Sequence, residues 1–248
     1  MELLHRRDFR IGFSSLGPHG EVRATALMGL LEEAAGEHAG AWGLSVNDLR
    51  PRGLTWMISR YHLRILRAPR WGEGLEVATW PSGRTTMFAT RDFEVSGAGG
   101  EPVAVATTSW VVIDLEQKKP VPVRQVVPEQ FVLERRAFTD AFGALPKLEV
   151  SAHEVALPVM RRDLDLNAHV GHTVYVEWAL EAVPREALKG ARLLAVEVSY
   201  RAEANLGDRI VSAVDAGEAP GDGRSFRHRI AHAESGFELA RLRTTWGR

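Results

Sequence analysis

The order of helical and strand-like segments in the first half of the chain returns in the second half, and this repeat constrains the fold more than any other feature. In the first half, apolar residues at helical spacing run from Ala24 to Trp42 and precede a series of strand-like segments. In the second half, a helical pattern at about 170–183 again precedes such segments. The predicted strands are 54–66, 74–81, 86–95 and 103–114 in the first half, and 193–202, 208–216, 224–233 and 237–246 in the second.

Short local matches support the repeat. Residues 106–110, Ala-Thr-Thr-Ser-Trp, resemble residues 242–246, Leu-Arg-Thr-Thr-Trp. A single helix followed by a meander of long strands predicts a curved antiparallel sheet wrapped around that helix. We therefore expect an α+β chain with one such unit at 1–125 and a second at 150–248. They would be joined by an interdomain linker at 126–149 that packs along the surface.

Composition limits the class of protein. The 248 residues are 45% hydrophobic and 25% charged, which is ordinary for a globular protein. The net charge of −1 excludes a globally basic nucleic-acid binder, and no apolar run approaches the ~20 residues of a membrane span. The absence of cysteine excludes disulfides, thiolate nucleophiles and cysteine–zinc sites. Because the chain begins without a signal-peptide core, we expect a soluble cytoplasmic protein.

The segment 163–181 carries the strongest chemical signal. Asp165, Asn167 and His169 alternate with small or apolar residues and run directly into an amphipathic helix. A carboxylate, an amide and an imidazole therefore gather at a helix N-terminus, where unpaired N–H groups and the helix dipole stabilise negative charge. Acyl transfer needs such a setting, with a base to activate a nucleophile and donors for an oxyanion.

A structural interpretation competes with this catalytic one. Asp and Asn are preferred N-cap residues, so Asp165 or Asn167 could cap the helix that begins near Val170. His169 could be a buried histidine with one hydrogen bond. A metal site is not indicated, because zinc needs three or four convergent ligands and the sequence has no His-Glu-x-x-His motif.

An ordered set of segments over nearly the whole chain resembles the acyl-acyl carrier protein thioesterase family of plants and bacteria. Members of this family terminate fatty-acid synthesis and are built as a tandem double hotdog. The segments are 53–60, 70–73, 76–80, 109–112, 163–170, 175–181 and 200–203.

The resemblance implies catalysis in the C-terminal hotdog by Asp165, Asn167 and His169 at the helix entrance and by Glu203 on the next strand. Ala204 stands where the family often has a cysteine, so the carboxylates must carry the chemistry. The family's Asn pair at the helix entrance is replaced here by Gly171 and His172.

The expected reaction is thioester hydrolysis without a metal or organic cofactor. Glu203 or Asp165 would activate the attack on the acyl carbonyl, either by water or by Asp165 itself. His169 and Asn167 would orient these groups, and backbone N–H groups near Val170 and Gly171 would help to polarise the carbonyl.

The N-terminal hotdog lacks an Asp-x-Asn-x-His segment, so we assign it to acyl-chain binding. The candidates are Leu27, Leu30 and Leu31 on the helix and Trp56, Ile58 and Trp80 on strands, although each also fits an ordinary hotdog core.

The implied partner is an acyl carrier protein that presents the acyl chain on a phosphopantetheine arm. Arg161 and Arg162, just before the catalytic segment, are candidate contacts for this acidic partner, as are Arg135 and Arg136 in the linker. All four also fit ordinary solvated surface residues. We expect no nucleic-acid partner, and either a monomer or a homodimer.

Three alternatives share the fold. A hotdog thioesterase acting on acyl-coenzyme A would use the same chemistry with a different partner. A hotdog dehydratase would leave Glu203 without a role. A non-catalytic acyl-binding hotdog would be expected to lose the four-residue set, whereas all four positions are filled here.

Overall fold

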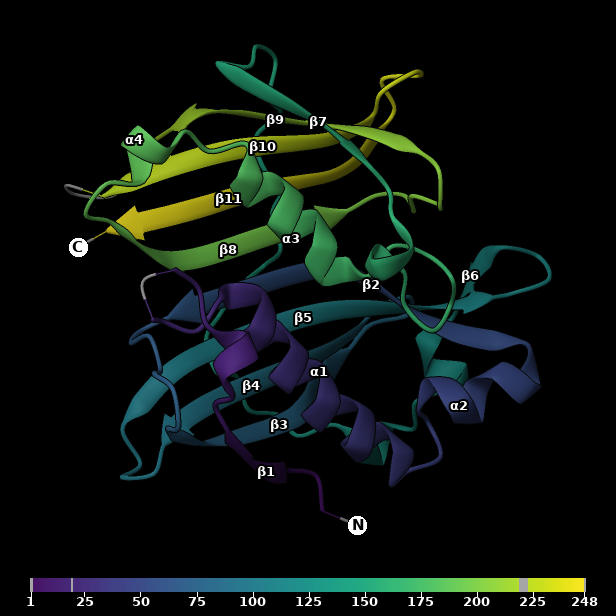
Figure 1. Cartoon of the computed structure of the whole chain (residues 1–248). Helices are drawn as coiled ribbons and strands as arrows, with labels where there is room; N and C mark the ends of the chain where they lie inside the picture. The colour runs from purple at the N-terminus through teal and green to yellow at the C-terminus, as the bar shows by residue number, and fades with distance from the viewer. Residues whose placement is uncertain (1, 19, 219–222, 248) are drawn as a thin grey trace. The chain divides into compact units, whose positions relative to one another are not determined.

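The structure is a computed structural model that describes residues 2–18, 20–218 and 223–247. The chain divides into two compact units, Met1–Ala141 and Phe142–Arg248, here called the N-terminal and C-terminal units. Each unit has an antiparallel sheet with one main helix lying across it, as Figure 1 shows. The predicted α+β class is therefore confirmed.

The N-terminal unit begins with strand β1 (His5–Arg10), followed by helix α1 (Ala24–Gly40) and the short helix α2 (Val46–Leu49). Its sheet has the order β1-β3-β4-β5-β2, and β6 pairs with β5. The remaining strands are β2 (Leu54–Ile65), β3 (Gly74–Arg84), β4 (Ala89–Gly97), β5 (Pro102–Asp114) and β6 (Lys119–Val121).

The C-terminal unit repeats this plan. Strand β7 (His153–Pro158) precedes helix α3 (His172–Glu181) and the short helix α4 (Arg185–Leu188). The sheet order is β8-β11-β10-β9-β7. Its other strands are β8 (Arg192–Tyr200), β9 (Arg209–Gly217), β10 (Arg224–His232) and β11 (Glu238–Gly247).

The eight predicted strands are all present, but the strand before each main helix was not predicted. β1 pairs with β3 and β7 pairs with β9, each at the edge of its sheet. β1 reads His-Arg-Arg-Asp-Phe-Arg, and such charged sequences are typical of edge strands but lack the apolar alternation by which strands are recognised. The second predicted helix is also shorter than expected, because a loop occupies residues 164–171.

The two faces of the N-terminal sheet are covered by different parts of the chain. α1 covers one face with Leu27, Met28 and Leu31, which are fully buried. On the same face, the Arg91 side chain contacts both His38 of α1 and Thr79 of β3. Successive side chains of a strand point to opposite faces, so Trp80 points away from α1.

Residues 133–140 cover the opposite face of the same sheet. The carboxylate of Asp92, which is fully buried, accepts hydrogen bonds from strand side chains and from this segment. Its donors are Ser82 Oγ (2.8 Å), Thr107 Oγ1 (2.7 Å), Arg136 Nε (2.9 Å) and Ala137 N (2.8 Å). A buried carboxylate with this many donors fixes the segment in place.

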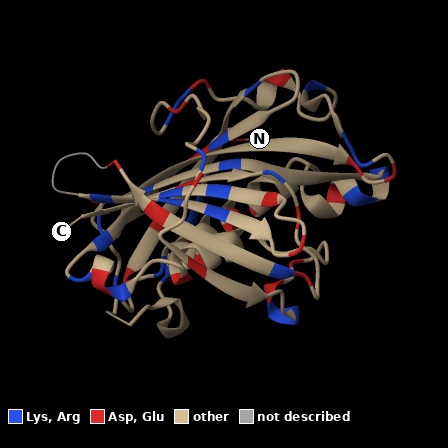
Figure 2. Ribbon diagram, turned by 90° about the horizontal axis from the view of Figure 1, so that it is seen from above, with Lys and Arg blue, Asp and Glu red and all other residues tan. Residues whose placement is uncertain are grey.

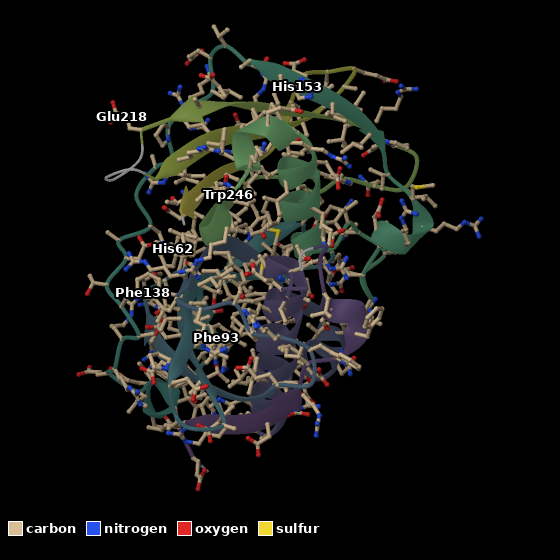
Figure 3. The ribbon with its side chains drawn as sticks, turned by 60° about the vertical axis from the view of Figure 1, so that its left-hand side comes forward. His62, Phe93, Phe138, His153, Glu218 and Trp246 are labelled. Carbon is tan, nitrogen blue, oxygen red and sulfur yellow. The ribbon has the colours of Figure 1, made fainter. Side chains whose placement is uncertain are left out.

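The same covering segment continues over β2. His62 of β2 forms a 2.6 Å contact with the Asp140 carboxylate, and its ring meets Phe138 edge-on with the centroids 4.9 Å apart. Figure 3 shows His62 and Phe138 side by side on this face. Residues 133–140 therefore pack on the N-terminal sheet, whereas the assignment of all of 126–149 as an interdomain linker stays a prediction.

Candidate active site

The loop before α3 is a closed turn of backbone hydrogen bonds. Leu164 and Val170 form an isolated β-bridge, and inside it Asp165 N donates to His169 O at 2.8 Å. Ala168 N donates to Asp165 O at 3.0 Å, and Ala168 adopts a left-handed conformation with φ of 60°. The predicted catalytic residues of this segment therefore lie on one tight turn at the helix entrance.

The Asp165 side chain stabilises the turn and does not cap α3. Its Oδ1 accepts the N–H of Asn167 at 2.7 Å. The N-cap of α3 is Gly171, which has no side-chain capping bond, so the capping interpretation of Asp165 and Asn167 is wrong for this helix. Among the described residues, no hydrogen bond is made to the other carboxylate oxygen of Asp165.

His169 and Glu203 face each other across the entrance. His169 Nδ1 lies 3.3 Å from Glu203 Oε2, and the two side chains are 39% and 48% exposed. An ion pair this exposed contributes little free energy by itself. Its geometry must therefore come from the backbone on either side.

Glu203 lies in the connection between β8 and β9, three residues after β8 ends at Tyr200. The expectation that Glu203 lies on a strand is therefore wrong. Both neighbours of Glu203 are held by backbone bonds: Ala202 N donates to Leu239 O at 3.1 Å, and Ala204 O accepts from Val170 N at 3.2 Å. This second bond joins the Glu203 segment to the residue that follows His169.

Tyr175, in the first turn of α3, was not predicted to belong to the site. Its phenol oxygen accepts the N–H of Ala204 at 2.9 Å and donates to Ala202 O at 3.4 Å. Burial is the main cause that raises the pKa of Tyr175 to about 12, and the carboxylates of Glu203, Asp165 and Asp208 raise it further. The phenol is therefore neutral at physiological pH and surrounded by acidic groups.

The prediction that the N–H groups of Val170 and Gly171 polarise the acyl carbonyl is wrong. Val170 N already donates to Ala204 O at 3.2 Å, and Gly171 N donates to Asp163 O at 2.9 Å. These two N–H groups are thus used by the fold and are not available to an acyl oxygen. The positive end of the α3 dipole still points at this entrance.

The predicted acyl-binding residues occupy different environments. Leu27 and Leu31 are fully buried, Leu30 is half-buried, and Ile58 is 8% exposed. Trp56 donates from Nε1 to Leu44 O at 2.8 Å and packs against the cluster around Leu49.

Trp80 lies on the face of the sheet that is opposite to α1. Its Nε1 donates to Arg135 O at 2.8 Å, and the Arg135 guanidinium lies 4.5 Å from the ring centroid. A chain bound between α1 and the sheet would therefore not contact Trp80.

The candidate arginines also separate into two groups. Arg161 and Arg162 are exposed on the turn just before the site, with Arg162 Nε 3.8 Å from Asp163 Oδ1. Arg135 instead pairs with Glu94, and Arg136 pairs with buried Asp92, so both serve the N-terminal unit's own packing. Acidic and basic residues are interleaved over the ribbon, as Figure 2 shows. Any attraction for a charged partner must then be local.

Within the C-terminal unit, the residues that the structure describes bring no three His, Asp or Glu ligand atoms together as a metal site would require. No helix in the described part of the chain has the length and apolar character needed to cross a bilayer.

Two protein-family models match this chain. Residues 2–131 match the acyl-ACP thioesterase N-terminal domain, and residues 147–248 match the acyl-ACP thioesterase C-terminal domain. The chain belongs to the acyl-ACP thioesterase family. The family resemblance inferred from the sequence is thereby confirmed.

Similar proteins in plants extend this result. An acyl-[acyl-carrier-protein] hydrolase of Cuphea viscosissima is 30% identical over 262 residues, which is 98% of this chain and 63% of that protein. An oleoyl-acyl carrier protein thioesterase of Coriandrum sativum is 26% identical over 98% of this chain and 77% of its own length. Both relatives are named as chloroplastic. The chain thus spans about 63% of the length of the Cuphea relative.

Solved structures of the family confirm the double hotdog fold. The 12:0-ACP thioesterase from Umbellularia californica has a TM-score of 0.89, with 26% identity, 99% of this chain and 94% of that chain covered. A putative oleoyl thioesterase from Lactobacillus plantarum, 23% identical, has the same fold with a TM-score of 0.86 over 98% and 95% of the two chains.

Proposed function

We propose that this acyl-ACP thioesterase family member hydrolyses the thioester of an acyl-acyl carrier protein and releases a free fatty acid. The observation that carries the proposal is the arrangement at the α3 entrance, where His169 and Glu203 lie 3.3 Å apart beside the Asp165 turn. A base, a carboxylate and the positive end of a helix there meet the needs of acyl transfer.

In the proposed reaction, a nucleophile adds to the thioester carbonyl carbon at this entrance. The resulting oxyanion is stabilised by the α3 dipole and by the Asn167 amide. The carbon–sulfur bond then breaks, and protonated His169 supplies a proton to the leaving thiolate. The only products are the free acid and the carrier thiol, so no cofactor takes part in the balance.

Two nucleophiles fit this geometry. In the first route, Glu203 takes a proton from water through His169, and the resulting hydroxide attacks. Glu203 then returns this proton to His169, which delivers it to the thiolate. In the second route, Asp165 attacks and forms a mixed anhydride, which water hydrolyses. When water opens the anhydride at the Asp165 carbonyl, a single turnover in labelled water places oxygen-18 in the Asp165 carboxylate, whereas the first route places it in the released acid only.

We assign acyl-chain binding to the N-terminal unit, with Leu27, Leu30, Leu31 and Ile58 on the α1 side of its sheet and Trp56 at the edge of this region. These residues supply apolar surface, and each buried methylene is worth about 0.8 kcal/mol. Trp80 is not included, because its ring contacts Arg135 on the opposite face.

The proposed carrier-protein contacts are Arg161 and Arg162. Both are exposed and belong to the turn that leads directly into the catalytic loop. Guanidinium groups there suit the acidic surface of a carrier protein or the phosphate of its arm. We place the reaction in the cytoplasm, since a chain without cysteine fits a reducing compartment.

The test is a panel of acyl carrier protein thioesters of different chain length, assayed beside the matching coenzyme A thioesters. Mass spectrometry would follow the free acid, and Asp165→Asn would serve as the control that keeps the turn-forming oxygen. Hydrolysis that depends on Asp165 and favours carrier thioesters supports the proposal. A preference for coenzyme A thioesters would favour the alternative acyl-CoA thioesterase, and binding without release would exclude both enzymes.

A further inference from the structure

We propose that Tyr175 is a positioning residue that holds Glu203 against His169 through its phenol oxygen. This inference rests on the proposed function, because it assigns a residue to the same site. It concerns a side chain that does not itself reach the reacting atoms and acts through the Glu203 segment.

The first argument is the pattern of contacts. Glu203 is flanked by Ala202 and Ala204, and one phenol oxygen bonds to both: it accepts from Ala204 N and donates to Ala202 O. The phenol thus bridges the two peptide units on either side of Glu203. Since Tyr175 belongs to the first turn of α3, these bonds join the Glu203 segment to the helix whose entrance carries His169.

The second argument is that the Glu203–His169 pair cannot hold its own geometry. Both side chains are more than one third exposed, and exposed pairs of this kind are weak and mobile. A catalytic pair needs its distance fixed to within a fraction of an ångström. The rigid groups nearby are the Val170–Ala204 backbone bond and the phenol of Tyr175.

The third argument comes from the N-terminal unit, which contains the same scaffold without the tyrosine. Val22 N donates to Pro69 O at 3.2 Å there, as Val170 N donates to Ala204 O at 3.2 Å in the C-terminal unit. The fourth residue of α1 is Leu27, and the fourth residue of α3 is Tyr175.

Pro69 has no N–H, so the position that matches Ala204 has no donor to satisfy in the N-terminal unit. The scaffold therefore forms with an apolar residue and a proline at these two places. The phenol is an addition of the unit that carries the proposed chemistry, and the fold itself does not require it.

The test is a double-mutant cycle between Tyr175→Phe and Glu203→Ala in the full chain, with an acyl carrier protein thioester as substrate. We expect Tyr175→Phe alone to lower kcat about tenfold and to change KM by less than twofold. In the Glu203→Ala background, the same change should alter kcat by less than twofold, because a residue that acts through Glu203 has nothing left to position. Equal effects in both backgrounds would overturn the proposal.

A matched control is Tyr200→Phe. The Tyr200 phenol is part-buried and donates to His172 O at 3.0 Å, a bond that reaches α3 and not the Glu203 segment. We expect kcat of this variant to stay within twofold of the original. A tenfold loss of kcat in both variants would overturn the proposal, because the effect would not be specific to the phenol that contacts the Glu203 segment.

A second variant separates positioning from the cost of an unpaired N–H. Tyr175→Phe combined with Ala204→Pro removes the phenol and the N–H together, as in the N-terminal unit. We expect the double variant to unfold at the temperature of the original while kcat stays low. Recovery of kcat would show that the phenol only satisfies the Ala204 N–H.

Amide hydrogen exchange gives a readout that does not depend on turnover. We expect the Ala204 amide to exchange about tenfold faster in Tyr175→Phe than in the original or in Tyr200→Phe. Unchanged exchange would overturn the proposal even in an active enzyme. Faster exchange in a protein that hydrolyses no thioester would instead leave Tyr175 as the anchor of this segment and reject the proposed function.

Discussion

The loops that lead into α1 and α3 have the same backbone hydrogen bonds but different side chains. Gly17 N donates to Glu21 O at 2.8 Å before α1, as Asp165 N donates to His169 O at 2.8 Å before α3. Gly20 N donates to Gly17 O at 3.1 Å, as Ala168 N donates to Asp165 O at 3.0 Å. Arg23 N donates to Ser15 O at 2.9 Å, as Gly171 N donates to Asp163 O at 2.9 Å. Each loop is closed by one isolated β-bridge, Leu16–Val22 or Leu164–Val170.

The difference between the loops is therefore chemical. Gly17 stands where the C-terminal loop has Asp165, Glu21 where it has His169, and Ala68 where the facing segment has Glu203. The comparison teaches that the turn forms without the side chains that we propose to be catalytic. Their presence in the C-terminal loop is then better explained by function than by folding.

The largest expected effect is the loss of kcat when the Asp165 carboxylate is removed. Asp165→Asn keeps an oxygen that accepts the Asn167 N–H but removes the carboxylate, so we expect kcat to fall about 10²–10⁴-fold, the usual contribution of general acid–base groups. In the N-terminal loop, Gly17→Asp should leave kcat unchanged. A Cβ at Gly17 would meet its nearest neighbour, Arg23 Cγ, at 3.5 Å, which is ordinary contact. Equal losses from the two variants would contradict the assignment of the chemistry to the C-terminal loop.

The next largest effect is on the free energy of unfolding, and it compares the two sheet faces that lie opposite to α1 and α3. Asp92 is fully buried under residues 133–140, whereas Arg227 of β10 pairs with Asp215 at 3.0 Å and both remain about one third exposed. Removing one partner of a buried ion pair leaves uncompensated donors, so Asp92→Asn should lower the free energy of unfolding by about 3 kcal/mol. Arg227→Gln should cost less than about 1 kcal/mol. Urea unfolding of both variants measures the difference, and similar costs would mean that the Asp92 network is not what fixes the covering segment.

In each unit, one buried histidine with a lowered pKa makes the stability depend on pH. Burial, and then the Arg91 charge, lower the pKa of His38 to about 4, and burial lowers the pKa of His228 to about 3. The unfolded chain then binds more protons than the folded chain below pH 6.5, so stability is present above that pH and is lost as the pH falls. Between pH 8 and 5, each histidine should cost about 2 kcal/mol.

The share of each unit in this pH dependence can be separated. His228→Gln retains a donor toward Thr244 Oγ1, which lies 2.9 Å from His228 Nε2, and removes the titration. We expect this variant to lose about half as much stability as the original chain between pH 8 and 5. An unchanged loss would place the pH dependence elsewhere.

The smallest effect concerns one backbone position that is shared by both loops. Ala168 has φ of 60° where Gly20 has φ of 75°, and only glycine adopts this region without a steric cost. Ala168→Gly should therefore stabilise the chain by about 1 kcal/mol, and Gly20→Ala should destabilise it by a similar amount. No atom lies within 4 Å of a Cβ built at Gly20, so the cost there is conformational alone. Thermal unfolding of both variants checks the opposite signs.

Much of the fold could be predicted from the sequence because the same order of helical and strand patterns occurs in both halves of the chain. The match between the segments at Trp110 and Trp246 proved structural: each indole Nε1 donates to the threonine two residues earlier, Thr108 at 2.8 Å and Thr244 at 3.0 Å. β1 and β7 could not be predicted in this way, because edge strands carry polar residues on one face and have no long apolar run.

The site was predictable only in part. Asp165, Asn167 and His169 are close in sequence, so their pattern was visible, whereas Glu203 depended on resemblance. Tyr175 was missed because a tyrosine on an apolar helix face is typical of a core residue, and its bonds to Ala202 and Ala204 are visible only in three dimensions. The same limit applies to Arg136, whose buried partner Asp92 is 44 residues away.

Main-chain bonds close both entrance loops although Gly17, Glu21 and Ala68 stand where the other unit has Asp165, His169 and Glu203, so these three positions can differ while the loop keeps its backbone bonds. The N-terminal entrance is thus a ready template for laboratory evolution, where libraries at Gly17, Glu21 and Ala68 can be screened with the native C-terminal entrance as an internal reference.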